Sequence, residues 1–294
     1  MTPDDVEAGL RLCRLSHWNQ VARDWQQFLT LTPGGATVAT DDAGLVVGSV
    51  ATVRYAAAHR EREAAHVPQS MAWIAMVLVD PAHRGQGIGT ALLHRGLAQV
   101  ADVTTVGLDA TPLGRPLYET LGFRADSTFT RMRREPASLA LPDDSGGAHR
   151  SRVREATPAD HDAISALDAV GSGLDRRTML AWLQDGAPDL AWVHEGAAGI
   201  DGAVLGRQGH AAVHLGPVVA SSTAIAAALL QAVVTTQAER AVLVDVADAR
   251  AGWREAVEAM GFREQRPFTR MYRGNWRPPA DLTRLFAIIG AEFG

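Results

Sequence analysis

Three glycines in one short loop are the residues of this sequence that point most directly to chemistry. Gly85, Gly87 and Gly89 lie between an apolar stretch typical of a strand and an apolar stretch with helical spacing. Because glycine has no Cβ atom, such a loop lets backbone N–H groups of the first helical turn converge on an anion, and the helix dipole favours negative charge there. The spacing predicts a pyrophosphate cradle, although a tight strand-to-helix turn could use the same glycines.

Two common nucleotide motifs do not account for this loop. A dinucleotide fingerprint needs a third glycine in G-x-G-x-x-G spacing, which the sequence GQGIGTAL lacks. A P-loop needs a lysine, and the chain contains none. The cradle is therefore of another kind.

The loop closely resembles the acetyl-CoA motif of the GNAT acyltransferase superfamily. Residues 84–89, Arg-Gly-Gln-Gly-Ile-Gly, fit the family pattern Q/R-x-x-G-x-G/A and follow a hydrophobic strand and Asp-Pro. Residues 108–123, LDATPLGRPLYETLGF, resemble the family's second strand-and-helix segment, which ends in Tyr118 followed by Gly122 and Phe123. Two motifs in the right order, about thirty residues apart, indicate this family for the first half of the chain.

The resemblance implies a mixed α/β fold with acetyl-CoA as co-substrate. In the family, backbone N–H groups of the loop hold the pyrophosphate and the preceding strand lends main-chain groups to the pantetheine arm. A residue after the next strand often touches the coenzyme as well. The residues expected at these positions are Arg84, Gly85, Gln86, Gly87, Ile88, Gly89 and Thr90 in the loop, Val77, Leu78 and Val79 in the strand, and Thr111, where relatives often carry an asparagine.

Tyr118 is the expected general acid. Family members commonly use a tyrosine at this place to protonate the departing CoA sulfur, and a phenol with a pKa of about 10 keeps its proton at neutral pH. The alternative is a helix tyrosine that packs its ring and caps a neighbouring group. The general base stays open, because Met71–Val79 contains no carboxylate and the candidates are Asp24, Asp109, Glu119 and His66.

The resemblance also places the acceptor pocket beside the turn between the first two helices, where HWNQ occupies residues 17–20. Core packing would explain the aromatic residues of this segment equally well. The acceptor contacts expected there and on the second strand are Trp18, Asn19, Asp24 and Asp109.

The reaction implied is direct transfer of an acetyl group from acetyl-CoA to a primary amine of a small molecule in a ternary complex. The alternative is a non-catalytic acyl-CoA-binding regulatory or sensor protein, which would need the same glycine loop. Tyr118 and the polar turn favour the enzyme. Acetylation of protein amines is less supported, because no acidic groove for basic peptides is evident.

The composition limits the number of domains and the kinds of partner that the chain can have. A chain of 294 residues with 47% apolar and 21% charged residues suggests about two globular domains, and its net charge of −5 argues against nucleic acid as a partner. Cys13 is the single cysteine, so a buried inert thiol in a reducing compartment is expected. The ten histidines lack metal-ligand spacing, and no apolar run is long enough for a membrane helix. We expect a cytoplasmic monomer or homodimer without a metal.

The second half of the chain repeats the first. The segment LGFRADSTFTRMRR at 121–134 returns at 260–273 as MGFREQRPFTRMYR, with G-F-R and F-T-R-M at a constant spacing of 139 residues. Near the start of each half, Thr2-Pro3 returns as Thr157-Pro158 at a spacing of 155. The first half therefore carries about sixteen extra residues, which fall near 56–69 and form either a solvated loop or a wall of the acceptor site.

The second copy has lost the glycine loop. The spacing of 139 takes Arg84–Gly89 to the sequence TAIAAA at 223–228, and it takes Tyr118 to Val257, which cannot donate a proton. Alanine side chains at this position would obstruct close approach of the backbone to a pyrophosphate. We expect the second half to keep the fold without acyl-CoA chemistry, a pattern that resembles tandem GNAT proteins with one degenerate half.

The elements that must position these residues follow from the spacing of apolar side chains. The pattern predicts helices within 1–31 and strands at 36–39, 45–55, 71–79, 103–109 and 123–134. We expect a catalytic domain over 1–134, a linker over 135–151, a degenerate domain over 152–274 and a C-terminal segment over 275–294. Apolar spacing in that segment predicts a helix packed on its parent domain, or alternatively a tail that reaches the acceptor cleft of the first half.

Overall fold

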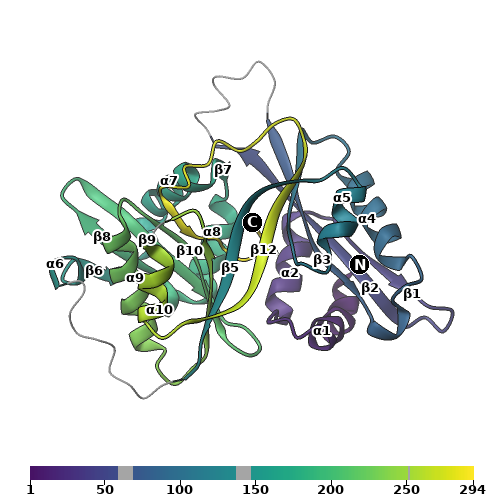
Figure 1. The fold of residues 1–294 in the computed structure, drawn as a ribbon, viewed down its shortest axis with the longest axis horizontal. Helices are drawn as coiled ribbons and strands as arrows, with labels where there is room; N and C mark the ends of the chain where they lie inside the picture. The colour runs from purple at the N-terminus through teal and green to yellow at the C-terminus, as the bar shows by residue number, and fades with distance from the viewer. Residues whose placement is uncertain (59–68, 137–146, 251) are drawn as a thin grey trace.

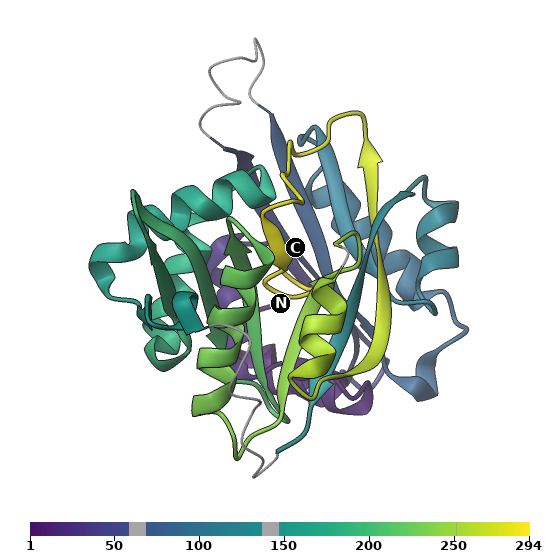
Figure 2. The same ribbon diagram turned by 60° about the vertical axis from the view of Figure 1, so that its left-hand side comes forward.

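The computed structural model describes residues 1–58, 69–136, 147–250 and 252–294, which form one 13-stranded sheet with helices on its faces (Figures 1 and 2). The strand order is β1-β2-β3-β4-β12-β5-β11-β13-β10-β9-β8-β6, with β7 paired to β2. The predicted mixed α/β class is confirmed.

The bounds of the elements are as follows. The helices are α1 (Val6–Leu15), α2 (Ala22–Leu31), α4 (Ile88–Gln99), α5 (Arg115–Thr120), α6 (Gly147–Arg150), α7 (His161–Ser172), α8 (Arg177–Gly186), α9 (Thr223–Thr236) and α10 (Trp253–Ala259). The strands are β1 (Ala36–Thr40), β2 (Val46–Ala57), β3 (Ser70–Val79), β4 (Thr105–Ala110), β5 (Arg124–Arg134), β6 (Val153–Glu155), β7 (Leu174–Asp175), β8 (Trp192–Gly196), β9 (Gly199–Arg207), β10 (Val213–Ala220), β11 (Val242–Ala247), β12 (Arg263–Gly274) and β13 (Leu285–Ala287).

In the first half, β3 is apolar after Ser70 because helices cover both faces of the sheet. Successive side chains of a strand point to opposite faces. Trp73 belongs to the buried cluster that contains Phe28 of α2, whereas its neighbour Ile74 belongs to the cluster that contains Leu93 of α4. Cys13 lies in the first cluster, and burial raises the pKa of its thiol to about 12, as expected for an inert thiol.

The second half repeats this arrangement, with α7 and α8 on one side of β9 and β10 and α9 on the other. Both halves also begin with the same cap. The N–H of Thr2 donates to Asp5 at 2.7 Å, and the N–H of Thr157 donates to Asp160 at 2.7 Å. The duplication predicted from sequence is therefore present in the fold.

The last strand of each half is exchanged with the other half. β5 pairs with β11 of the second half, and β12 pairs with β4 of the first half, so β5 and β12 run side by side through the middle of the molecule (Figure 1). Two buried ion pairs cross this junction: Arg131 with Asp245 at 2.6 Å, and Arg270 with Asp109 at 2.8 Å. Both arginines are the arginine of the repeated F-T-R-M, and each binds an aspartate of the other half.

The prediction of a helix within residues 275–294 is wrong. The segment forms strand β13, which lies between β10 and β11 and pairs with both. These two strands pair with each other only over Val213–Leu215 and Val242–Val244 and then separate. A gap between strands exposes main-chain groups that need partners, and an extended segment supplies them where a helix cannot.

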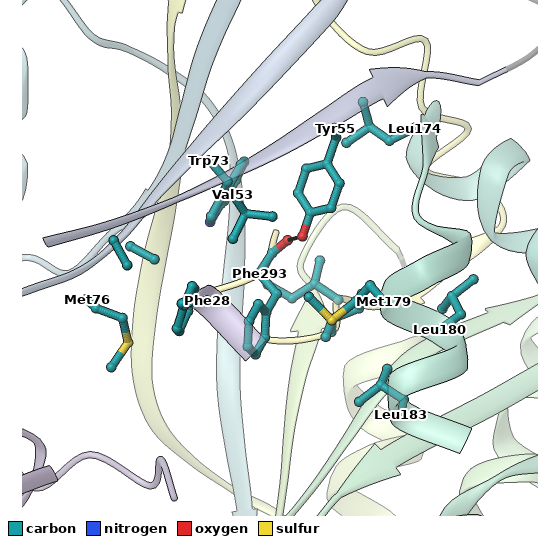
Figure 3. Packing of buried hydrophobic residues seen from close by; sticks show 14 of the residues in the cluster. Phe28, Val53, Tyr55, Trp73, Met76, Leu174, Met179, Leu180, Leu183 and Phe293 are labelled. Carbon is teal, nitrogen blue, oxygen red and sulfur yellow. Dashed lines mark hydrogen bonds between the residues drawn. The ribbon is translucent and has the colours of Figure 1, made fainter. Parts of the chain in front are cut away.

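After β13, the C-terminal segment enters the space between the two halves, and its Ala291 and Glu292 line a pocket of the first half. Phe293 is fully buried and stacks on Phe28 with ring centroids 4.8 Å apart (Figure 3). The hydroxyl of Tyr55 donates to the carbonyl oxygen of Phe293 at 2.8 Å. Met179 and Leu180 of α8 complete the same cluster. The segment therefore fastens the two halves together.

Two predicted segments fall mostly outside the described residues. Of the extra residues at 56–69, the structure describes 56–58 and 69; of the linker at 135–151, it describes 135–136 and 147–151. Within the parts of the chain that are described, no helix is long and apolar enough to cross a membrane. Those parts also contain no group of three or more His, Cys, Asp or Glu side chains placed to hold a metal ion.

Candidate active site

The candidate site lies where β3 and β4 separate. These strands are parallel neighbours only over Met71–Trp73 and Thr105–Gly107. Farther along, Met76 adopts a φ of 54° and the register between β2 and β3 shifts, which makes a bulge. The hydroxyl of Ser49 donates to the Met76 carbonyl oxygen at 2.8 Å and holds the bulge in place. Main-chain groups of β3 therefore face an opening instead of a neighbouring strand.

A pocket of about 450 Å³, part of it open to solvent, occupies this opening. Both halves of the chain and the C-terminal segment contribute side chains, so the pocket is complete only when all three are in place. Its lining consists of Trp18, Gln20, Ile74, Ala75, Met76, Val77, Leu108, Asp109, Thr111, Tyr118, Arg131, Arg266, Phe268, Ala291 and Glu292. The structure thus brings together five of the predicted site residues: Trp18, Val77, Asp109, Thr111 and Tyr118.

The glycine loop after β3 has the backbone conformation of an anion cradle. Gly85 and Gly87 have φ of +76° and +80°, and a Cβ atom at either would meet open space, so the left-handed conformation itself calls for glycine. Gly87 is also the N-cap of α4. Among the described residues, no hydrogen-bond acceptor binds the backbone N–H groups of residues 85–90. These donors and the helix dipole suit a pyrophosphate.

Asp80 anchors the start of this loop. Its carboxylate accepts hydrogen bonds from Arg11 at 2.6 Å and from the N–H of Ala82 at 3.0 Å, and together they lower the pKa of Asp80. Arg84 folds back and donates from Nε to the carbonyl oxygen of Val79 at 3.2 Å. The exposed guanidinium of Arg84 therefore remains beside the loop and adds positive charge there.

In the second half, the helix that corresponds to α4 is α9, and its N-terminus has a different structure. Helix α9 follows Ser222, whose hydroxyl accepts a hydrogen bond from the N–H of Ile225 at 3.3 Å. A side chain thus caps the N-terminus of α9, where α4 begins with a glycine turn. In addition, β13 fills the gap between β10 and β11 that corresponds to the opening between β3 and β4.

Tyr118 lines the pocket from α5. Its ring packs edge-on against Phe123, with centroids 6.1 Å apart, and Gly114 leaves room for it, because a Cβ atom there would lie 2.9 Å from Cε2 of Tyr118. The hydroxyl has no hydrogen-bond partner among the described residues, and burial raises its pKa to about 12. Tyr118 is therefore a protonated donor at neutral pH. Thr111 lies just before α5, and its hydroxyl accepts a hydrogen bond from the N–H of Gly114 at 3.2 Å.

Asp109 is the base candidate that lines the pocket. It accepts hydrogen bonds from Nε and Nη2 of Arg270 at 2.9 and 2.8 Å. Burial raises the pKa of Asp109, and Arg270 opposes that shift. Glu119 instead lies on the exposed side of α5, where it pairs with Arg115 at 2.8 Å. The fourth candidate, His66, lies outside the described residues.

The turn between α1 and α2 contributes Trp18 and Gln20 to the pocket, but it directs Asn19 elsewhere. The amide of Asn19 donates to the carbonyl oxygen of Ala212 at 2.9 Å and accepts from the N–H groups of Ala211 and Ala212. Asn19 therefore ties the first half to the loop between β9 and β10.

Asp24 and Glu292 share one arginine of the second half. Nε of Arg207 lies 3.1 Å from Asp24, and Nη2 donates to Glu292. Asp24 also accepts from the N–H of Val21, burial raises its pKa to about 6, and it does not line the pocket. Glu292 does line the pocket; burial would raise its pKa, but Arg207 and other nearby cations lower it.

Four polar or charged pocket residues were not among those predicted: Gln20, Arg131, Arg266 and Glu292. Gln20 belongs to the polar HWNQ turn, and Arg131 belongs to the repeated F-T-R-M, so both had a signal in the sequence. Arg266 and Glu292 had none, because one arrives on the exchanged strand β12 and the other on the C-terminal segment.

Comparison with known proteins agrees with this geometry. Two family models described as acetyltransferase (GNAT) domain match residues 33–125 and 164–287. The uncharacterized N-acetyltransferase YitH of Bacillus subtilis is 23% identical over 225 residues, which cover 75% of this chain and 76% of that protein. A solved structure from Pyrococcus horikoshii superposes with a TM-score of 0.77 at 19% identity, covering 100% of this chain and 94% of the other. A tandem GNAT protein from the clavulanic acid biosynthesis pathway superposes with a TM-score of 0.61 at 17% identity, covering 93% and 96%.

Proposed function

The chain belongs to the GNAT superfamily of acetyltransferases, with two GNAT domains in tandem, and we propose that its first half transfers an acetyl group from acetyl-CoA to a primary amine of a small molecule. This proposal rests on the structural difference between the two halves at the coenzyme position. In the first half, β3 and β4 separate beside the N–H groups of residues 85–90. In the second half, β13 fills the gap and Ser222 caps the helix.

The first half offers matching partners to each part of the coenzyme. The backbone N–H groups of residues 85–90 would hold the pyrophosphate. The main chain of Val77–Val79, at the free edge of the opening, would hydrogen-bond the amides of the pantetheine arm, as an added strand does. This places the acetyl group toward the pocket that Tyr118 and Thr111 line.

Different pocket residues would act as the base and as the acid of the reaction. The acceptor ammonium gives up a proton to Asp109 or Glu292, the two carboxylates that line the pocket. The neutral amine attacks the acetyl carbon, the C–S bond breaks, and the thiolate takes the phenolic proton of Tyr118. The nitrogen loses its second proton as the amide forms, and this proton restores the phenol of Tyr118 through solvent. The products are the acetylated amine, CoA and the first proton, which the carboxylate releases to solvent. Holding both reactants in one pocket makes the attack effectively unimolecular.

Release of free CoA thiol tests this function. We expect the protein to release thiol from acetyl-CoA faster when a primary amine is added, with one acetylated amine formed for each thiol. A panel of amines should contain members that accelerate release strongly over the amine-free rate. Coenzyme binding without acceleration by any amine would contradict acetyl transfer and would favour an acyl-CoA sensor.

Tyr118→Phe should lower kcat about 100-fold, because loss of a general acid typically costs 10² to 10⁴ in rate. The KM for acetyl-CoA should change by no more than about twofold, since the hydroxyl acts mainly on the departing thiolate. Steady-state thiol release measures both. Undiminished turnover of Tyr118→Phe would remove this residue from the mechanism.

A further inference from the structure

The pocket adjoins a second, positively charged hollow, here called the outer hollow. This hollow encloses about 1070 Å³, part of it open solvent, and shares Trp18, Arg131 and Arg266 with the inner pocket. Its lining also includes Arg14 and Arg133, and no Asp or Glu among the described residues. A solute that approaches the inner pocket from this side therefore passes several arginine side chains.

Most of these arginines are already neutralised or bonded. Arg131 is paired with Asp245, and Arg133 is paired with Glu135. Arg14 donates to the carbonyl oxygens of Trp18 and Gln20, which uses two of its five N–H groups without cancelling its charge. The hollow therefore keeps a net positive charge around Arg266.

Arg266 is a cation without a directly bonded counterion, although the carboxylates of Asp245 and Glu292 lie near enough to oppose the lowering of its pKa. It has no hydrogen bond or ion pair with any described residue, and its Nε atom is buried. Arg131 lies directly opposite it on β5, and like charges at opposed positions of paired strands destabilise a sheet. Burial and Arg131 lower the pKa of Arg266 to about 10, so the guanidinium still carries its charge at neutral pH.

Arg266 has no counterpart in the first copy of the repeat. At the spacing of 139 residues that relates F-T-R-M in the two halves, Arg266 corresponds to Ser127. The arginine is therefore specific to the strand that enters the first half's pocket. The side chain of Gln20, in the same pocket, likewise keeps a buried Oε1 atom without a partner.

We infer that the acceptor amine carries an anionic group, a carboxylate or a phosphate, which Arg266 binds while the amine lies deeper in the pocket. This inference rests on the proposed acetyl transfer and names its substrate class. The two ends of the pocket fit such a molecule. Arg266 and Arg14 line the outer hollow, and the carboxylates Asp109 and Glu292 line only the inner pocket. Both carboxylates are paired with arginines, and their remaining lone pairs can accept hydrogen bonds from an ammonium group.

Paired amines test the inference in the same thiol-release assay. Amino carboxylates of increasing chain length are compared with their amides, and phosphoethanolamine is compared with ethanolamine, so the two series tell carboxylate from phosphate. The anionic member of the best pair should exceed its neutral partner about 10- to 100-fold in kcat/KM, as a hydrogen-bonded charge pair provides.

Arg266→Gln should bring that ratio of anionic to neutral amine close to one. Arg273→Gln is the matched control, because Arg273 is an exposed arginine of the same strand outside both cavities, and it should keep the ratio of the parent. Neutral amines preferred by the parent, or a ratio unchanged by Arg266→Gln, would overturn the inference while leaving acetyl transfer intact.

If no amine accelerates thiol release, the proposed acetyl transfer is wrong, and the anion site must be tested by binding alone. Calorimetric titration of the same amine pairs then measures binding directly. Tighter binding of the anionic member that depends on Arg266 would support an anion site. Equal binding of both members, or no binding of either, would reject it.

Discussion

Replacing Arg270 with methionine is expected to lower the free energy of unfolding by about 3–5 kcal/mol, because it leaves a buried carboxylate without its partner. Asp109 has a fully buried side chain and receives both of its charged hydrogen bonds from Arg270. The Arg270 side chain also lies between the rings of Trp73 and Phe129, so methionine keeps most of the packing. Denaturant unfolding at pH 7 measures the loss.

The loss in Arg270→Met should depend on pH. Burial already raises the pKa of Asp109, and removal of Arg270 raises it further. A carboxyl whose pKa is raised in the folded state costs no stability below its unfolded pKa of about 3.9, and the cost grows as pH rises toward the folded pKa. The deficit relative to the parent protein should therefore be smaller at pH 5 than at pH 8.

Two further variants distinguish the cost of an unpaired buried carboxylate from a general loss of stability caused by mutating an arginine. Arg254→Met breaks exposed pairs with Glu258 and Glu264 and should cost less than about 1 kcal/mol. Adding Asp109→Leu to Arg270→Met removes the unpaired carboxylate and should restore most of the lost stability. A loss as small as that of Arg254→Met, or a double variant no better than Arg270→Met, would contradict the buried-pair account.

Gly87→Val is expected to weaken acetyl-CoA binding at least about 100-fold, equivalent to about 2.7 kcal/mol. Gly87 has a φ of +80°, which a β-branched residue adopts only with strain, so the turn must change shape. That turn is what directs the N–H groups of residues 85–90 toward one point. Calorimetric titration with acetyl-CoA measures the change in Kd.

Gly252→Val is the matched control for the strain. Gly252 has a φ of +73°, precedes α10 as its N-cap, and faces open space, as Gly87 does before α4. The two variants should therefore lose similar thermal stability, but Gly252→Val should bind acetyl-CoA like the parent. Affinity retained in Gly87→Val, or lost equally in both, would count against the cradle.

The sequence predicted the features that depend on local patterns. The glycine loop and the strand before it are short-range signals with a direct physical cause, and the structure places both as expected. The repeated F-T-R-M predicted two copies of one fold. It could not predict the strand exchange, because β5 and β12 have the same apolar pattern whichever half they pair with.

The sequence could not predict where the C-terminal segment lies. Leu282, Leu285, Phe286 and Ile289 have helical spacing, but the gap between β10 and β11 determines the outcome by offering unpaired main chain. Context of this kind often overrides local propensity. Glu292 reaches the pocket only because of that placement, so no pattern near it in the sequence signalled a role.

A crystal structure of the parent protein with acetyl-CoA would show which half binds the coenzyme. We expect one coenzyme per chain, with its pyrophosphate at the N–H groups of residues 85–90 and its pantetheine arm between β3 and β4. A coenzyme bound at the N-terminus of α9 or between β10 and β11, with none at the glycine loop, would contradict this expectation.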